Sequence, residues 1–239
     1  MTNFSLPKTI TPDPIIDSVV EIRFNSPLPE DKVFGLLFNA LSQYYPKYKK
    51  ISNTIPVITG INISKFTPDI RLENEEFTIG IGSNVVLYRC IGGYKGWQKY
   101  FSGIKRDIEM LFNEGVLGNS MERIGIRYVN YFEEIDDISK HIELTIKFSE
   151  KEDYITQQTT YRTVLSKNNI SHTLSVADKI SMPNKHKGSL IDIDSSRSNF
   201  EFSNKEDLFN IIDEIHKEEK ILFFSLLKKD FLQTLNPTY

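Results

Sequence analysis

Two arginines and their neighbours form the residue pattern that is best suited to binding. Arg123 and Arg127 stand four residues apart in a predicted strand over residues 123–132, so both side chains project from one face, about 13 Å apart. Tyr128 and Asn130 then project from the opposite face. Guanidinium groups bind carboxylates and phosphates. The pattern predicts either an anion-binding surface or ion pairs that join the sheet to its helices.

A pair of acids could supply a metal site. Asp192 and Asp194 alternate along a predicted strand, so their carboxylates lie on one face about 7 Å apart. Two carboxylates placed in this way can hold Mg²⁺ for phosphoryl chemistry. Acids are also ordinary on the solvent face of a strand, and no third acid follows at a suitable spacing. The sequence leaves both a metal site and a solvated strand face open.

His216 lies at the border of the apolar stripe of a predicted helix. A histidine in this position more often serves packing than chemistry, but it can also bind a ligand. It completes the candidate ligand-binding set, whose other members are Arg123, Arg127, Tyr128 and Asn130.

Another histidine and the cysteine have surroundings that favour structural roles. His172, in a predicted strand, has no identifiable nucleophile partner in the sequence. Cys90 stands in an apolar strand and is typical of a buried small hydrophobic residue. It is the only cysteine of the chain, so the chain cannot form an internal disulfide.

The sequence lacks the short motifs of the common metal, nucleotide and hydrolase sites. It contains no Cys-x-x-Cys, His-x-x-x-His or His-Glu-x-x-His motif, which are typical of metal sites. It also contains no Walker lysine loop, no Gly-x-Gly-x-x-Gly fingerprint and no Gly-x-Ser-x-Gly elbow. We therefore predict no cofactor and assign no catalytic residue.

Composition indicates a folded chain with little net charge. Apolar residues make up 39% of the 239 residues and aromatic residues 12%, which excludes a disordered chain. The 29 Lys and Arg against 32 Asp and Glu leave a net charge of −3, which does not support nucleic-acid binding. A mixture of lysines and tyrosines over residues 44–50 could bind nucleic acid, but we favour the end of a helix.

The chain carries no sign of a membrane or of secretion. No apolar run approaches the roughly 18 residues that span a bilayer, and the first residues lack the basic and apolar regions of a signal peptide. We predict a cytoplasmic protein.

Hydrophobic periodicity predicts an α+β fold of two packed halves, each a mainly antiparallel sheet covered by helices. The first half, residues 1–135, has the order β-α-β-β-β-α-β, and Trp97 is predicted as a core anchor at the head of its second helix. The predicted elements are strand 17–24, helix 30–44, strands 55–66, 76–81 and 85–91, helix 97–112 and strand 123–132.

The second half, residues 136–239, has the predicted order β-β-β-β-α-α and follows an acidic connection at residues 133–139. A capping box of Ser203 and Glu206 opens its first helix. The other predicted elements are strands 141–148, 154–165, 170–177 and 189–193, an apolar block at 221–227 and a short helix near 231–235.

Several strings of the sequence, taken in order, resemble a family of uncharacterised, sporadically distributed bacterial proteins of similar length. They are residues 14–24, 94–97, 123–130 and 192–194, and the helix that contains His216 with Phe223 and Phe224. The string Arg-x-Gly-x-Arg-Tyr-x-Asn, at 123–130, is the most specific of them. The resemblance implies no known reaction, cofactor or catalytic residue. The patchy distribution is like that of accessory genes, among them toxin–antitoxin and phage-defence components.

Two functions of different classes fit these observations. The first is a non-enzymatic binding or regulatory protein, such as a toxin–antitoxin or phage-defence accessory subunit, whose partner is another protein or a second copy. The second is an enzyme or sensor of a phosphorylated ligand, with Arg123 and Arg127 on the phosphate and a metal at Asp192 and Asp194. The second requires these arginines and aspartates to converge on one open cleft.

Overall fold

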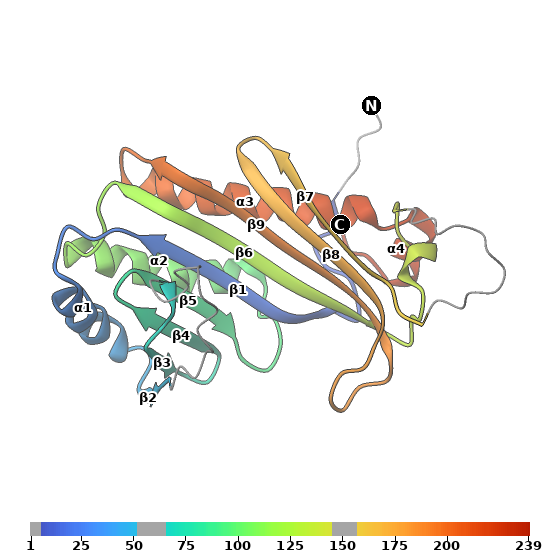
Figure 1. The fold of residues 1–239 in the computed structure, drawn as a ribbon, viewed down its shortest axis with the longest axis horizontal. Helices are drawn as coiled ribbons and strands as arrows, with labels where there is room; N and C mark the ends of the chain where they lie inside the picture. Colours follow the sequence, from blue (N-terminus) through green and yellow to red (C-terminus); the bar gives the residue numbers. More distant parts are fainter. Residues whose placement is uncertain (1–5, 52–65, 145–156) are drawn as a thin grey trace. The chain divides into compact units, whose positions relative to one another are not determined.

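The computed structural model describes residues 6–51, 66–144 and 157–239. Within them the fold is α+β, and nine strands form one large antiparallel sheet in the order β2-β3-β4-β5-β1-β6-β9-β8-β7 (Figure 1). The predicted fold class is therefore confirmed. The finer prediction, a separate sheet in each of two packed halves, is not confirmed, because all the described strands belong to one sheet.

The elements follow the predicted order with several changes of boundary. The strands are β1 (Ile15–Phe24), β2 (Lys47–Lys50), β3 (Ile70–Glu73), β4 (Phe77–Gly82), β5 (Val85–Cys90), β6 (Ser120–Glu133), β7 (Thr160–Lys167), β8 (Ile170–Ile180) and β9 (Gly188–Glu201). The helices are α1 (Glu30–Ser42), α2 (Trp97–Asn113), α3 (Lys205–Leu226) and α4 (Lys229–Thr234), with a 3-10 turn, η2, at Ile138–Lys140.

The chain divides into two compact units, each built from separate stretches of sequence. Unit 1 contains residues 1–16, 127–195 and 215–239, and unit 2 contains residues 17–126 and 196–214. The sequence instead predicts the consecutive halves 1–135 and 136–239. The unit boundaries fall inside β1, β6, β9 and α3, so each of these elements contributes residues to both units.

In unit 2, β2 to β5 form an antiparallel meander, and β5 pairs with β1. From Val20 to Phe24 alternate residues of β1 are buried, as period-two patterning predicts, but Ser18 and Val19 before them are buried as well. Helix α2 contacts the sheet through Tyr100, whose hydroxyl donates to the carbonyl oxygen of Tyr88 in β5 at 2.7 Å. Both helices predicted here are confirmed. The predicted strand 55–66 lies almost wholly outside the described residues.

Residues 44–50 do not form the end of a helix. Helix α1 ends at Ser42, and β2 pairs with β3 in a register that places Lys47 opposite Glu73 and Lys49 opposite Arg71. The prediction was wrong because the pairing partner, β3, is short and charged and was not recognised as a strand. Tertiary pairing therefore decided the conformation of these residues, as it commonly does for short segments.

In unit 1, β7 and β8 form a hairpin (Figure 1). The turn between them is tight: Asn168 and Asn169 adopt left-handed conformations, with φ of 52° and 61°, which a two-residue hairpin loop requires. The predicted strands 141–148 and 154–165 lie partly outside the described residues. Strand β9 is longer than predicted, because its second part lacks apolar alternation.

Helix α3 is one continuous element where the sequence predicts two apolar blocks. Its capping box is also shifted by one residue from the predicted Ser203 and Glu206. Asn204 accepts a hydrogen bond from the backbone of Asp207, whose carboxylate accepts one from the backbone of Ser203.

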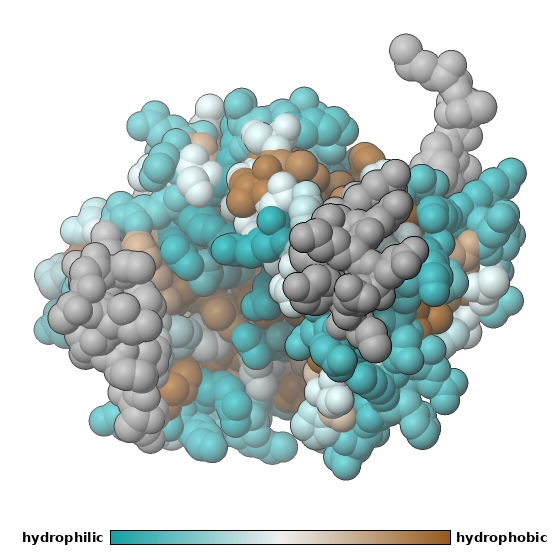
Figure 2. Space-filling view, turned by 45° about the vertical axis from the view of Figure 1, so that its right-hand side comes forward, coloured by the Kyte–Doolittle hydropathy of each residue, from teal (hydrophilic) through white to brown (hydrophobic). Residues whose placement is uncertain are grey.

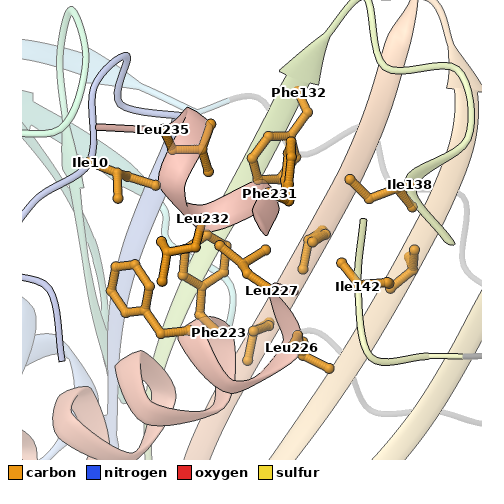
Figure 3. Packing of buried hydrophobic residues seen from close by; sticks show 14 of the residues in the cluster. Ile10, Phe132, Ile138, Ile142, Phe223, Leu226, Leu227, Phe231, Leu232 and Leu235 are labelled. Atoms are coloured by element: carbon orange, nitrogen blue, oxygen red, sulfur yellow. The ribbon is translucent and has the colours of Figure 1, made fainter. Parts of the chain in front are cut away.

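The end of α3 packs with α4 in the hydrophobic core of unit 1 (Figure 3). Ile10 brings the N-terminal segment into this core, and a backbone bridge between Thr9 and Thr238 ties that segment to the C-terminus. The labelled members of the cluster are Ile10, Phe132, Ile138, Ile142, Phe223, Leu226, Leu227, Phe231, Leu232 and Leu235.

Trp97 is half-buried, so it is not the core anchor that the sequence predicts. Its ring stacks on Phe101, with 4.8 Å between centroids, and its Nε1 donates to the carboxylate of Asp213 at 2.7 Å. Deeply buried positions of α2 lie one, two and three turns further on, at Tyr100, Ile104 and Ile108.

One face of the molecule is mostly hydrophilic, with hydrophobic residues in separate patches (Figure 2). In the described ranges no helix has the length and apolar character needed to cross a membrane.

Candidate functional site

The candidate residues of unit 1 lie on opposite faces of the sheet. Arg127 is exposed, while its neighbour Tyr128 and the next residue of the same parity, Asn130, are buried. Asp192 and Asp194 are half-buried and alternate with the core residues Ile191 and Ile193. This alternation agrees with the predicted strand faces.

Arg127 on β6 and Asp192 on β9 form a two-pronged ion pair. The Nε atom of Arg127 donates to Oδ1 of Asp192 at 2.8 Å, and Nη2 donates to Oδ2 at 2.7 Å. Such parallel bonds are stronger and more directional than a single contact. Both carboxylate oxygens of Asp192 therefore accept hydrogen bonds from Arg127. An anion at Arg127, or a cation at Asp192, would have to compete with this pair.

The predicted metal site has little support beyond the two aspartates. In the part of the chain that the structure describes, no group of three or more His, Cys, Asp or Glu side chains is placed to hold a metal ion. The pair Asp192 and Asp194 stays a prediction.

Arg123 belongs to unit 2 and pairs with a residue that sequence reasoning missed. Its Nη1 atom lies 2.6 Å from Oε1 of Glu21 on β1, and that carboxylate also lies 2.8 Å from Nε of Arg23. The side chains of Arg123 and Glu21 are only 18% and 14% exposed. Glu21 thus balances two arginines in a partly buried position. Its alternation with Arg23 along β1 is the only sequence signal for it.

Gly125 allows the Arg123 side chain to reach Glu21. A Cβ atom at position 125 would lie 2.6 Å from the guanidinium carbon of Arg123 and closer still to its Nη1. The guanidinium therefore lies directly over the glycine. Residues 123–125, the first part of the string that carries the family resemblance, serve an ion pair in this structure.

Tyr128 and His216 join β6 to α3. The Tyr128 hydroxyl lies 3.2 Å from Nδ1 of His216, and the two rings meet edge to face with 5.9 Å between centroids. Asn130 is buried and donates from Nδ2 to the carbonyl oxygen of Ile191 at 3.3 Å. The three side chains therefore make contacts that connect strand β6 to its neighbours in unit 1.

Glu219, one turn after His216, is a buried acid that sequence reasoning missed. It is 3% exposed, and no hydrogen-bond partner for its carboxyl is found among the described residues. Burial raises the pKa of Glu219 to about 8, against a smaller opposite effect of Lys220, so the neutral form prevails at pH 7. The signal in the sequence is its spacing: Ile215, Glu219 and Phe223 follow one another at intervals of four on the apolar stripe.

His172 contacts a serine, a residue type that can act as a nucleophile, and this partner could not be identified from the sequence. Its Nδ1 lies 2.7 Å from Oγ of Ser195, and burial lowers the pKa of His172, while the charge of Glu218 acts in the opposite direction. Serine, histidine and acid can form a hydrolytic triad. Here Ser195 has no exposed surface, so a substrate cannot reach its hydroxyl. We interpret the pair as a link between β8 and β9.

A second buried acid lies in unit 2. Asp107 of α2 accepts hydrogen bonds from the Tyr45 hydroxyl at 2.7 Å and from Nε of Arg106 at 2.8 Å. Burial raises the pKa of Asp107 to about 6, although both partners favour its charged form. The guanidinium of Arg106 also stacks on Tyr44, 3.9 Å from the ring centroid. This cluster holds the residues after α1 against α2.

Comparison with known proteins gives no match that bears on the site. No family model matches the chain, and no curated protein matches it either. The resemblance carried by residues 123–130 stays a prediction.

We expect Gly125→Ala to lower the free energy of unfolding by about 1 kcal/mol, the usual contribution of such a partly exposed ion pair. The added methyl group displaces the Arg123 guanidinium from Glu21. Gly103→Ala is the control, because a Cβ there meets no atom within 4 Å, and alanine favours a helix. Urea denaturation measures both. The interpretation fails if Gly125→Ala is equally destabilising when Arg123 is already alanine.

We expect Glu219→Gln to flatten the dependence of stability on pH. Because the folded-state pKa of Glu219 is raised, the contribution of this residue to stability is most favourable below pH 4.5 and falls as the pH rises toward 8. Above pH 8 the variant should be more stable by about 3–5 kcal/mol, since each pKa unit corresponds to about 1.4 kcal/mol. Denaturation at pH 5, 7 and 9 measures this, with exposed Glu114→Gln as the control. Parallel profiles for wild type and Glu219→Gln would contradict a buried, unpaired acid.

Proposed function

We propose that this chain is a non-enzymatic binding or regulatory protein of the cytoplasm, an accessory subunit of the toxin–antitoxin or phage-defence kind. The observation that carries the proposal is the two-pronged pair of Arg127 with Asp192. An enzyme or sensor of a phosphorylated ligand would need the guanidinium of Arg127 for the phosphate and the carboxylate of Asp192 for a metal. In this chain the two groups bind each other instead.

The rival function makes conflicting demands on these residues. A phosphate needs an arginine fork that is open toward the ligand, and a metal needs carboxylate oxygens that are not already hydrogen bonded. Arg127 and Asp192 satisfy each other instead, and Arg123 is held by Glu21. A phosphorylated ligand would have to break at least one of these pairs before it gained any contact.

The polar groups that face the helices also favour binding over catalysis. Tyr128 contacts His216 and Ser195 contacts His172, and three of these four side chains are buried. Catalytic groups must reach a substrate. Buried pairs of this kind instead fix the positions of strands and helices, which suits a protein that presents a rigid surface to a partner.

We expect Arg127→Met to lower the free energy of unfolding by about 1 kcal/mol, because Asp192 loses its partner. Sulfate should change the melting temperature of wild type and variant equally. Arg71→Met is the control, since Arg71 is similarly exposed, at 44% against 46%, and contacts Glu73 at 3.4 Å only. If sulfate or inorganic phosphate stabilises the wild type and this effect is lost in Arg127→Met alone, the phosphorylated-ligand function is correct.

The proposed binding function predicts a defined protein partner in native cells. The tagged full-length chain should enrich one protein in near-equal amount when it is captured and examined by mass spectrometry, and purified copies of the two should then form a complex. Hydrolysis of a phosphorylated compound by the purified chain would contradict the proposal, as would a failure to enrich any protein, an untagged second copy of the chain included.

A further inference from the structure

The two outermost strands of the described sheet differ in the side chains that they expose. At one end of the order lies β2, in which every residue is exposed and three of the four are lysines. Lysines on an edge strand oppose pairing with another chain. At the other end lies β7, where Val164 is 62% and Leu165 40% exposed. They are the most exposed large aliphatic residues in the described part of the chain.

Strand β7 has the backbone needed to accept another strand. It pairs with β8 along its whole length, with Val164 opposite Thr173 and Leu165 opposite His172. No strand among the described residues lies on its other side. An edge of this kind presents a row of N–H and C=O groups to a further strand.

We propose that β7 pairs with β7 of a second copy of this chain, antiparallel and centred on Val164. The proposal rests on the binding function given above and names one partner, the chain itself. A two-fold axis is the commonest symmetry of soluble oligomers, and it brings the same patch of both copies together.

The side chains of β7 fit this register. The two-fold axis stands perpendicular to the extended sheet and therefore keeps each side chain on its own face of the sheet. Directly opposite residues of two antiparallel strands also point to the same face. Only registers in which one residue lies opposite its own copy satisfy both conditions. Centring on Val164 pairs Val164 with its copy, Thr163 with Leu165, Arg162 with Ser166 and Tyr161 with Lys167. No like charges then stand opposite each other, and the most exposed aliphatic side chain meets another β-branched one, which favours strand pairing.

A register centred on Arg162 would place two guanidinium groups opposite each other and is unfavourable. Lys167 already contacts Glu218 at 2.8 Å, and this contact lowers the net positive charge that the two strands bring together. Strand β7 itself contains no acid, so charge alone also permits an acidic strand of another protein. The experiments below separate that occupant from a second copy.

The mass of the purified chain in solution tests the pairing. Light scattering after size exclusion should give a dimer at high micromolar concentration, and Val164→Lys should give a monomer, because two ammonium groups then stand opposite each other. Tyr48→Lys is the matched control: Tyr48 is 56% exposed on the other outermost strand, so this variant should stay dimeric. A monomeric wild type, or a Val164→Lys variant that stays dimeric, overturns the proposal.

A cysteine at the centre of the register tests the geometry directly. Directly opposite residues of paired strands have Cβ atoms about 4.5–5.5 Å apart, near the distance that a disulfide spans. In a Cys90→Ser background, Val164→Cys should form a disulfide-linked dimer on mild oxidation much faster than Tyr48→Cys. Equal rates overturn the proposal. Both tests use the purified chain alone, so their failure is distinct from a failure to capture another protein.

Discussion

Pairing of opposite charges organises the charged side chains of this sheet, at exposed and at partly buried positions. Arg127 and Asp192 stand on strands that are neighbours in the sheet, and each neutralises the other through two short hydrogen bonds. Arg123 reaches across to Glu21 for the same reason, since a guanidinium keeps its proton in proteins. At Glu219 burial outweighs the opposite charge of the neighbouring Lys220, and the raised pKa keeps the carboxyl neutral. Removing Arg123 would leave the partly buried Glu21 carboxylate with one cation fewer.

These interactions also explain why sequence reasoning recognised several of the interacting residues but not which of them pair with one another. Period-two alternation correctly placed Arg127 and Asp192 on half-buried strands, because the faces of a strand depend on local order alone. The register between strands depends on residues that are far apart in the chain, and nothing near Arg127 identifies Asp192. Ser195 was missed as the partner of His172 for the same reason.

Helices were easier to predict than strand boundaries, with instructive exceptions. The apolar stripe of α2 identified it correctly, because a helix of 17 residues carries several periods of its own pattern. Helix α3 was divided in two because Glu219 places a polar side chain on the stripe. Strand β3 was missed because four residues, two of them charged, give too short a pattern. The position of Trp97 shows that an aromatic residue on a stripe can still lie at the edge of the core.

Gly125 has a consequence for how this sequence can change over time. Its missing side chain makes room for the Arg123 guanidinium, and that guanidinium is needed because Glu21 is present. The residue that is favourable at each of these three positions therefore depends on the residues at the other two. A larger residue at 125 displaces the Arg123 guanidinium from Glu21 and costs less once Arg123 has been replaced, and loss of Arg123 removes one of the two cations beside Glu21. In descendants of this chain, positions 21, 123 and 125 should covary, although more than 100 residues separate the first from the last.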